Sequence, residues 1–274
     1  MQLTNENYYS QEANREYMSV SQFKDFAGTY GMLPCEFKAL EKLNGRWKEK
    51  KTTPLLVGSY VDAYYEGTLD EFKKNTPELF KRDGGLKAEY IKADKIIERT
   101  KRDEMFSRFM SGEKQVIMTG ELFGTKWKIK IDSYLAHPKF PGVVDLKVVK
   151  AVDGKEALEW VRDAGNMMWY QFWGYDIQGA IYQEIVRQNT GVMPEVYLAA
   201  VSKQDEPSIR IIHWTQKDLD QAMSIVRAQM PRVLRVKNGE APPDRCEVCD
   251  CCRHTRILNK VINSDELLAL GGAM

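Results

Sequence analysis

A short acidic and basic pattern is the first feature of this sequence that could perform chemistry. Residues 142–149, GVVDLKVV, alternate by two, so Asp145 and Lys147 share one strand face while Val144 and Leu146 lie on the other. Charged groups inside an apolar strand cost free energy unless they are paired or bind a metal. Taken alone, the triplet favours an ordinary buried ion pair or the polar face of an edge strand, and other acidic-x-Lys triplets lie in helical or loop contexts.

A second carboxylate, Asp132, changes that interpretation. It shares the polar face of residues 126–134 with Lys128 and Lys130, and the hairpin that follows can bring it beside Asp145. Two adjacent carboxylates raise each other's pKa unless a cation lies between them. Oxygen ligands of this kind suit Mg²⁺ or Mn²⁺, and a lysine beside the ion can orient a water or offset charge on a phosphate.

Two helical segments offer further polar groups. Asp62 is the only charged residue in the apolar helical pattern of residues 55–65, and Gly58, one turn earlier, would permit close approach to a sheet or ligand. Asp62 therefore either joins the metal site or reaches solvent from the rim of a core helix. On the helix expected over residues 167–188, one stripe carries two glutamines and two tyrosines: Gln171, Tyr175, Gln178 and Tyr182. Gln178 and Tyr182 could bond the carboxylates or a phosphate, although such a stripe more often contacts neighbouring loops.

Four of the five cysteines lie within seven residues. Cys246, Cys249 and Cys252 have the spacing with which one loop wraps a metal ion, and Cys251 is a spare or alternative ligand. Cys35 or His254 could supply the fourth ligand. Zinc binding and unmodified reduced thiols are both compatible with this pattern.

The elements that must position these residues change type along the chain. Helices are expected at residues 19–30, 34–43, 55–65 and 86–109, and strands at 115–122, 126–135 and 143–149, which form a three-stranded antiparallel meander. Helical patterns follow at 155–163 and 167–188, then strands at 196–202 and 209–214 and a helix at 217–236. This order predicts an α/β fold with a mixed central sheet flanked by helices.

Composition excludes several protein classes. The chain has 274 residues, 43% hydrophobic and 29% charged, which is typical of globular proteins and not of disordered or fibrous ones. We expect a single domain over 1–274, with a helical part to about 112, a sheet core at about 113–215 and a helix and cysteine-rich tail at about 216–274. Apolar stretches are too short to span a membrane and the N-terminus has no secretory signal pattern. With clustered cysteines and no such signal, we expect a reducing, cytoplasmic location.

The four motifs together resemble the PD-(D/E)xK nuclease superfamily, in particular its phage-type branch similar to exonuclease VIII. They run in family order: the first helix motif at 58–64, the aspartate motif at 131–134, Asp145-Leu146-Lys147 as the (D/E)xK motif, and Gln178 with Tyr182 as the Q-x-x-x-Y motif. The resemblance covers residues 19–255. It departs at Asp62, where related recombination nucleases often have histidine, and at Ile131, which replaces the motif's proline.

The resemblance implies a restriction-endonuclease-like core and metal-dependent hydrolysis of DNA phosphodiesters. It implies that Asp132, Asp145 and the Leu146 carbonyl ligate Mg²⁺ or Mn²⁺, with Asp62 as a further ligand. It also implies that Lys147 positions the nucleophilic water and that Gln178 and Tyr182 support the site. Several members hold a 4Fe-4S cluster between one N-terminal and three C-terminal cysteines, the places taken here by Cys35 and by Cys246, Cys249 and Cys252.

The leading functional hypothesis is an exonuclease that degrades linear double-stranded DNA in recombination or repair, paired with a single-strand annealing protein. A structure-specific endonuclease and a catalytically inactive DNA-binding scaffold are the alternatives. With 40 basic and 39 acidic residues, DNA contact must come from local patches, for which we expect Lys48, Lys50 and Lys51 with Trp47, and Lys126, Lys128 and Lys130. Related exonucleases form ring-shaped oligomers that gather basic residues around a channel.

Overall fold

A four-stranded mixed sheet forms the centre of the protein in the computed structural model, which describes residues 1–161, 164–258, 261–264 and 266. Its strand order is β3 (Ser133–Leu135), β4 (Gly142–Val149), β7 (Glu195–Ser202) and β8 (Ile209–His213). The β4–β7 pair is parallel, and the two outer pairs are antiparallel. The predicted α/β fold with a mixed sheet is confirmed.

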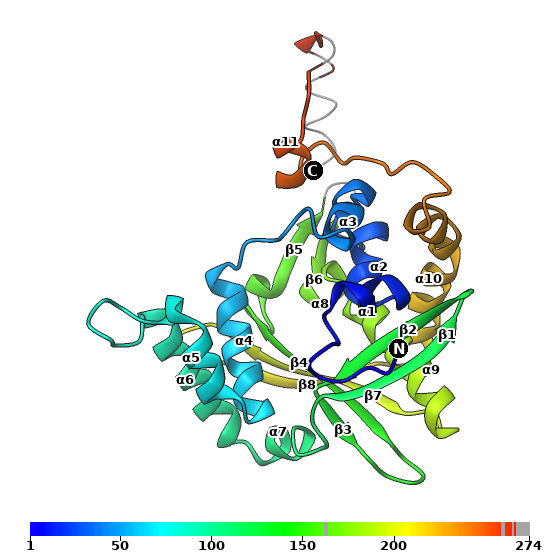
Figure 1. Ribbon diagram of the computed structural model, residues 1–274. Coiled ribbons are helices and arrows are strands. Elements are labelled where there is room, and N and C mark those ends of the chain that lie inside the picture. Colours follow the sequence, from blue (N-terminus) through cyan, green and yellow to red (C-terminus); the bar gives the residue numbers. More distant parts are fainter. Residues whose placement is uncertain (162–163, 259–260, 265, 267–274) are drawn as a thin grey trace.

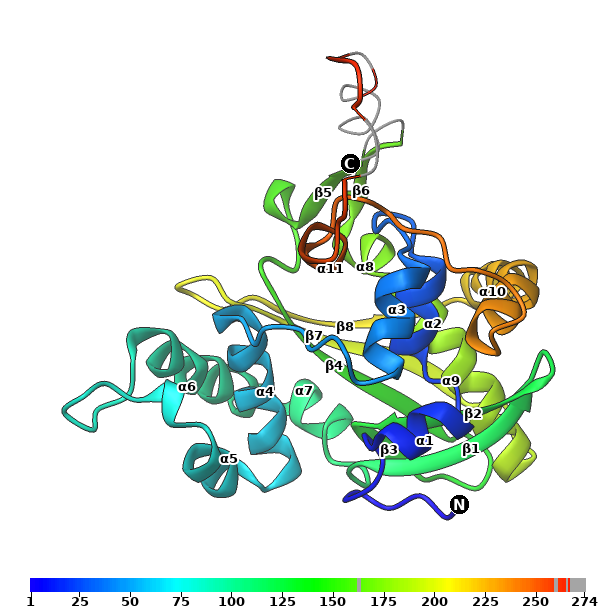
Figure 2. The same ribbon diagram turned by 45° about the horizontal axis from the view of Figure 1, so that its top comes forward.

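Helices cover both faces of this sheet, as Figures 1 and 2 show. On one face lie α4 (Thr53–Glu66), α5 (Leu69–Asn75), α6 (Ala88–Lys101) and α7 (Glu104–Phe109), and on the other α9 (Tyr175–Thr190) and α10 (Gln216–Lys237). Val144 and Leu146 pack in the hydrophobic core on the α4–α6 side of the sheet, and Val143 packs in the core on the α9–α10 side. The alternation of β4 therefore places Asp145 and Lys147 on the α9 face, as the sequence predicts.

The predicted three-stranded meander is wrong, because its middle strand breaks at Asp132. The first half, β2 (Thr125–Ile131), pairs with β1 (Val116–Leu122) and forms an isolated bridge with Met18, and the second half continues as β3. The turn between β1 and β2 has positive φ at both Phe123 and Gly124, which matches the twist of a tight hairpin. The two-residue alternation of polar and apolar side chains cannot reveal the break, since the alternation is found on both sides of Asp132.

The N-terminal helices and the described part of the C-terminal tail meet beside the sheet. The N-terminal part forms α1 (Gln11–Glu16), α2 (Val20–Ala27) and α3 (Glu36–Leu43), and the tail forms the short α11 (Asp250–His254), which contacts α3. Ser19 caps α2, with its hydroxyl accepting the Gln22 N–H at 3.3 Å. The helix expected over residues 86–109 is divided, because Asp103 caps a new helix at Phe106 N.

The segment between β4 and α9 differs most from expectation. The helix predicted at residues 155–163 is wrong. Its place is taken by a 3-10 turn, η2 (Lys155–Ala157), and by strand β5 (Leu158–Val161), which forms a hairpin with β6 (Gly165–Met168). Residues 162–163 lie outside the described part. The helix predicted from residue 167 begins later, since α8 (Trp169–Phe172) ends before α9 at Gly174, whose φ of 60° is left-handed. Short apolar runs fit either helix or strand, and long-range pairing decides between them.

None of the helices in the described ranges is long and apolar enough to cross a membrane.

Lys128, expected at the DNA surface, is instead a buried core residue. Only 1% of it is exposed, and its ammonium donates to the Tyr8 carbonyl and to Asn14 Oδ1, the latter at 2.7 Å. Burial lowers the pKa of Lys128 to about 8. The expected surface position of Lys128 is therefore wrong, although the residue lines the cavity described below, and Lys128 ties the N-terminal segment to β2.

We expect Lys128→Met to lower the free energy of unfolding by about 1–3 kcal/mol, because it leaves two buried acceptors without a donor. Chemical denaturation measures the change. The matched control is Lys126→Met, which removes an exposed ion pair with Glu16 at 3.2 Å and should cost less than about 1 kcal/mol. Equal effects of the two substitutions would contradict the structural role of Lys128.

Candidate active site

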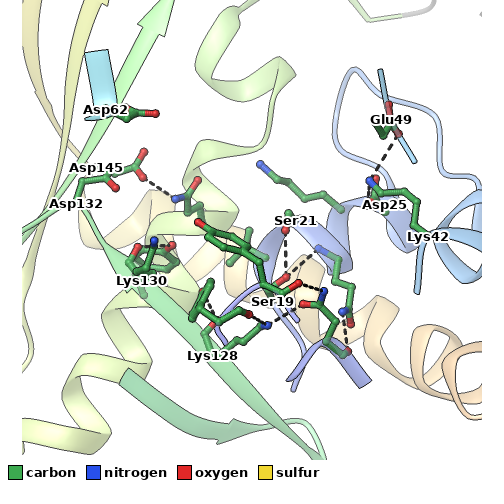
Figure 3. A pocket seen from close by; sticks show the side chains of 18 of the residues that line it. Ser19, Ser21, Asp25, Lys42, Glu49, Asp62, Lys128, Lys130, Asp132 and Asp145 are labelled. Atoms are coloured by element: carbon green, nitrogen blue, oxygen red, sulfur yellow. Dashed lines mark hydrogen bonds and ion pairs between the residues drawn. The ribbon is translucent and has the colours of Figure 1, made fainter. Parts of the chain in front are cut away.

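Three carboxylates from separate elements line one cavity of about 880 Å³ between the sheet, α9 and the α2–α3 pair. Asp62 comes from α4, Asp132 from the bend after β2, and Asp145 from β4 (Figure 3). In Figure 3 Asp132 and Asp145 lie side by side, and Asp62 reaches toward the cavity from the same side. Leu146, Lys147, Gln178 and Tyr182 line the same cavity, so the structure brings together every residue predicted for the catalytic and Mg²⁺ sites.

The position of Asp132 depends on a hydrogen bond across two strands. Its Oδ2 accepts the backbone N–H of Leu146 at 2.8 Å, which holds the bend beside β4. The next residue, Ser133, anchors the bend from behind: its hydroxyl donates to the Phe109 carbonyl at 2.8 Å and accepts the Gly112 N–H at 2.9 Å. The break that divides the predicted strand is thus the feature that aims Asp132 into the cavity.

Asp145 is held by a hydrogen bond on one oxygen and by an ion pair on the other. Oδ1 accepts a hydrogen bond from Gln178 Nε2 at 2.6 Å. Oδ2 lies 2.5 Å from the Lys147 ammonium as an ion pair, yet this buried oxygen makes no hydrogen bond within the described part of the chain. Lys147 Nζ also donates to the Leu146 carbonyl at 3.1 Å. A buried carboxylate oxygen with unused acceptor capacity fits a cation ligand.

Negative charge is concentrated where the three carboxylates meet, although lysines also line the cavity. Burial, reinforced by the charge of Asp145, raises the pKa of Asp132 to about 7. Burial also raises the pKa of Asp62 well above its usual value, with Asp132 as the next cause. Burial alone would lower the pKa of Lys147, but Asp145 and Asp132 outweigh it and raise that pKa. A divalent cation bound among these oxygens would relieve the repulsion, so the donor set fits Mg²⁺ or Mn²⁺.

The α4 helix positions Asp62 by packing its apolar face. Tyr60 and Val61 are fully buried against the sheet side of the helix, which leaves Asp62 to face the cavity. The expected close approach of the sheet at Gly58 is wrong, because a side-chain carbon added there would meet no protein atom within 4 Å; close approach of a ligand at Gly58 stays a prediction. Glu66, one turn after Asp62, also lines the cavity; the i, i+4 spacing on this helix was the signal for it in the sequence.

Three of the four residues expected in one polar stripe lie on a single helix, α9. Gly174 separates Gln171, which lies on α8 and lines a different cavity, from the other three residues. Gln178 reaches Asp145, and the Tyr182 hydroxyl donates to the Lys130 carbonyl at 3.1 Å. Tyr182 thereby joins α9 to β2 just before the bend at Asp132.

Several cavity residues were missed by the sequence analysis. Lys24 of α2 donates to the Trp173 carbonyl at 2.9 Å, and its ammonium lies 5.0 Å from the Tyr175 ring centroid. The Lys147 ammonium lies 5.1 Å from the same centroid, so one aromatic ring faces two cations. Burial, followed by the charge of Lys147, lowers the pKa of Lys24 to about 8. Tyr8 and Tyr9 also line the cavity; no motif or spacing signalled any of these three residues.

The basic residues expected to contact DNA divide into two groups. Lys48, Lys130 and the aromatic Trp47 line the cavity. Lys50 and Lys51 are exposed on the link from α3 to α4 and do not line it, and Lys126 is paired with Glu16.

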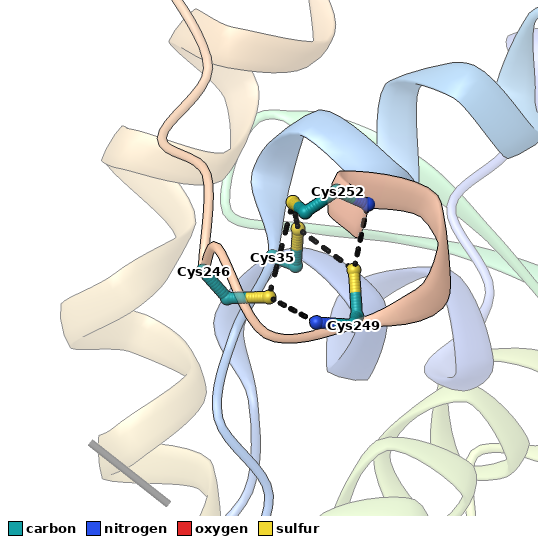
Figure 4. Close-up of side chains that lie close together, drawn as sticks. All are labelled: Cys35, Cys246, Cys249 and Cys252. Atoms are coloured by element: carbon teal, nitrogen blue, oxygen red, sulfur yellow. Dashed lines mark hydrogen bonds between the residues drawn. The ribbon is translucent and has the colours of Figure 1, made fainter. Parts of the chain in front are cut away.

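Four cysteine sulfurs converge at a second site, shown in Figure 4. Cys35, Cys246, Cys249 and Cys252 have Sγ atoms that all lie within 4.8 Å of one another, which makes Cys35 the fourth member of the group. His254, the alternative ligand, instead packs its ring against Trp47, with ring centroids 5.9 Å apart. Cys251 is buried and is not one of the four. All five cysteines are free of disulfides.

A family described as a PDDEXK-like domain of unknown function, DUF3799, matches residues 19–255. The chain belongs to this PDDEXK-like family. The chain also superimposes on the crystal structure of a "Putative exonuclease" from Eubacterium rectale with a TM-score of 0.93 and 60% sequence identity, over 98% of this chain and 99% of the other. Family and relative together support a nuclease of the PD-(D/E)xK type.

Other comparisons add little. The crystal structure of SSO0001 shares 15% identity over 78% of this chain and 88% of its own, and its TM-score of 0.30 is too low to indicate a shared fold. No curated protein sequence shows significant similarity to this PDDEXK-like chain.

We expect millimolar Mg²⁺ or Mn²⁺ to raise the melting temperature by several degrees, because an ion that binds only the folded state stabilises it by about 2.7 kcal/mol at 100 times its Kd. In Asp132→Asn the amide oxygen can still accept the Leu146 N–H while one ligand charge is lost, so the shift should shrink or disappear. Differential scanning calorimetry with and without EDTA measures it.

Asp153→Asn is the matched control, since Asp153 is exposed and paired with Arg210 at 2.5 Å outside the cavity. It should keep the full metal shift. A wild-type melting curve unchanged by either metal would argue against an ion at the three carboxylates.

Proposed function

We propose that this PDDEXK-like protein is a divalent-metal-dependent deoxyribonuclease that degrades linear double-stranded DNA as an exonuclease. The observation that carries the proposal is the meeting of Asp132, Asp145 and Lys147 in one cavity, with Asp132 bonded to the backbone of the Asp145 strand. This is the arrangement that metal-dependent phosphodiester hydrolysis needs: acidic ligands beside a fixed ammonium group.

Asp132, Asp145 and the Leu146 carbonyl would hold the ion, with Asp62 as a further ligand. When bound, Mg²⁺ or Mn²⁺ supplies Lewis-acid polarisation of a phosphate oxygen and an activated water. Asp145 Oδ2 is ion-paired with the Lys147 ammonium at 2.5 Å, whereas Asp132 Oδ2 accepts the Leu146 N–H. The two carboxylates therefore differ in role: Asp132 divides its oxygens between backbone and ligand, and Asp145 shares its charge with Lys147.

Lys147 would position the attacking water and offset negative charge that develops on the phosphate. Its neighbours raise its pKa, so the side chain acts as an ammonium donor and not as a base. Gln178 fixes the carboxylate of Asp145 through Oδ1, and Tyr182 fixes β2 through the Lys130 carbonyl. These two residues position the ligands, in the manner of hydrogen-bond partners around other metal sites.

The cavity walls suit a nucleic-acid strand. Lys24, Lys48 and Lys130 can contact phosphates, and Trp47 and the exposed Tyr9 can stack on bases. The Lys130 ammonium lies 4.8 Å from the Tyr9 ring centroid, so a cation and an aromatic face are paired at the rim. A role in recombination or repair, an annealing-protein partner and a ring-shaped oligomer stay predictions from the family resemblance.

We expect Asp145→Asn to reduce kcat/KM on linear duplex DNA by more than about 100-fold, because the substitution removes the charge of a direct metal ligand. Loss of only the hydrogen-bond partner of a metal ligand typically lowers activity by about 10–100-fold, so loss of the ligand's own charge should cost more. Digestion of labelled linear duplex with Mg²⁺ measures the loss, with circular dichroism as the check on folding. Asp153→Asn should retain activity.

Closed circular DNA serves as the second substrate. An exonuclease leaves it intact, whereas nicking of the circle by the wild type would favour a structure-specific endonuclease. Wild-type protein that cleaves neither substrate with any divalent ion would favour a DNA-binding scaffold.

We expect Gln178→Leu to lower activity by about 10–100-fold and to raise the metal concentration needed for half-maximal rate, because Asp145 loses its orienting hydrogen bond. A metal titration of the cleavage rate measures both effects. The control is Gln171→Leu, the exposed member of the predicted stripe that lines another cavity. If both leucine variants behaved alike, the positioning role of Gln178 would be refuted.

A further inference from the structure

The four-cysteine group joins distant parts of the chain. Cys35 immediately precedes α3, whereas the other three ligand candidates lie in the tail, and Cys249 is 214 residues from Cys35 in sequence. Figure 4 shows the tail loop wrapping three sulfurs around the fourth. All four lie away from the carboxylate cavity and none lines it.

Distances between the sulfurs distinguish the candidate ligands. The Cys35–Cys252, Cys249–Cys35 and Cys246–Cys252 Sγ pairs are 3.5, 3.8 and 4.0 Å apart. Four thiolates at about 2.3 Å from one tetrahedral zinc ion stand about 3.8 Å from each other. A 4Fe-4S cluster binds each thiolate to a different iron around a cube of eight atoms, which requires wider separations. The group therefore fits a single ion and does not fit the cluster.

The backbone around the sulfurs suits metal-bound thiolates. Cys249 N–H points to Cys246 Sγ at 3.3 Å, Cys252 N–H to Cys249 Sγ at 3.4 Å, and Lys38 N–H to Cys35 Sγ at 3.5 Å. Such donors stabilise thiolate charge. Within the tight loop, Glu247 has a φ of 62°, a left-handed conformation that is unfavourable in a residue other than glycine and persists when its surroundings enforce it.

We propose that Cys35, Cys246, Cys249 and Cys252 bind one structural zinc ion in tetrahedral geometry. Binding releases the four thiol protons to solvent and involves no redox change, since Zn²⁺ has a filled d shell. With four thiolate ligands and no position for water, the site is closed and structural.

The ion would fix one wall of the carboxylate cavity. The tail lies along α3, where the Glu36 carboxylate accepts from Arg232 at 2.6 Å and from Asp244 N at 2.7 Å. On its other side, α3 contributes Ala39, Lys42 and Leu43 to the cavity. A zinc link between Cys35 and the tail thus stabilises the helix that faces the DNA strand.

Metal analysis of the purified full-length chain tests the proposal independently of nuclease activity. We expect about one zinc per chain, no iron and no acid-labile sulfide. Two adjacent cysteines, both 0% exposed, provide the matched pair: Cys252→Ser should lose the zinc and Cys251→Ser should keep it.

Replacement of zinc by Co²⁺ in the wild type gives a second measurement should Cys252→Ser fail to fold. The expected visible spectrum is that of tetrahedral cobalt with thiolate ligands. Iron with labile sulfide, wild-type protein without bound metal, an octahedral cobalt spectrum, or equal metal loss from both serine variants would each overturn the proposal.

Discussion

The hydrogen bond from the Leu146 N–H to Asp132 Oδ2 is the interaction on which the active site depends. Asp132 and Asp145 belong to different strands, and their like charges favour separation. The bond from the β4 backbone offsets this repulsion, and it is stronger when its acceptor is ionised. Since the donor is main chain, no substitution of the Leu146 side chain other than proline removes it. The site is therefore as rigid as the β4–β7 pairing that fixes the strand.

Two elements outside the sheet complete this arrangement. The α9 helix supplies Gln178 to Asp145 and Tyr182 to the Lys130 carbonyl, so one helix restrains both acid-bearing strands. The α4 helix, which packs on the opposite face of the sheet, still brings Asp62 to the same cavity. Because α9 packs against β1, β2 and β7, and α4 against β4, any shift of the sheet relative to the helices would separate the ligands.

The sequence predicts the site better than the fold that surrounds it. Alternation along β4 identifies the face of Asp145 and Lys147, because an acidic and basic pair within an otherwise apolar strand needs a partner or a metal to be stable there. The same alternation misses the bend at Asp132, which depends on contacts of Ser133 with Phe109 and Gly112 in a distant segment. The 155–163 hairpin is missed for a similar reason, since strand pairing with residues 165–168 overrides a locally helical pattern. Lys24 belongs to no recognisable sequence motif, and its place in the cavity depends on the folded structure, which brings its ammonium over the Tyr175 ring.

The four-cysteine group joins the N-terminal region at Cys35 to the C-terminal tail. Cross-links between residues far apart in sequence restrict the unfolded chain most, so an ion bound by Cys35 and the tail stabilises the fold more than one bound within the tail alone. The bidentate pair between Arg232 and Glu36 ties α3 to α10, and Asp244 N–H of the tail donates to the same carboxylate at 2.7 Å; part of Arg232 is exposed to solvent, which weakens its contribution. Because α3 continues directly into Trp47 and Lys48, the cysteine site and the carboxylate cavity share one helix, and order at the first helps to shape the second.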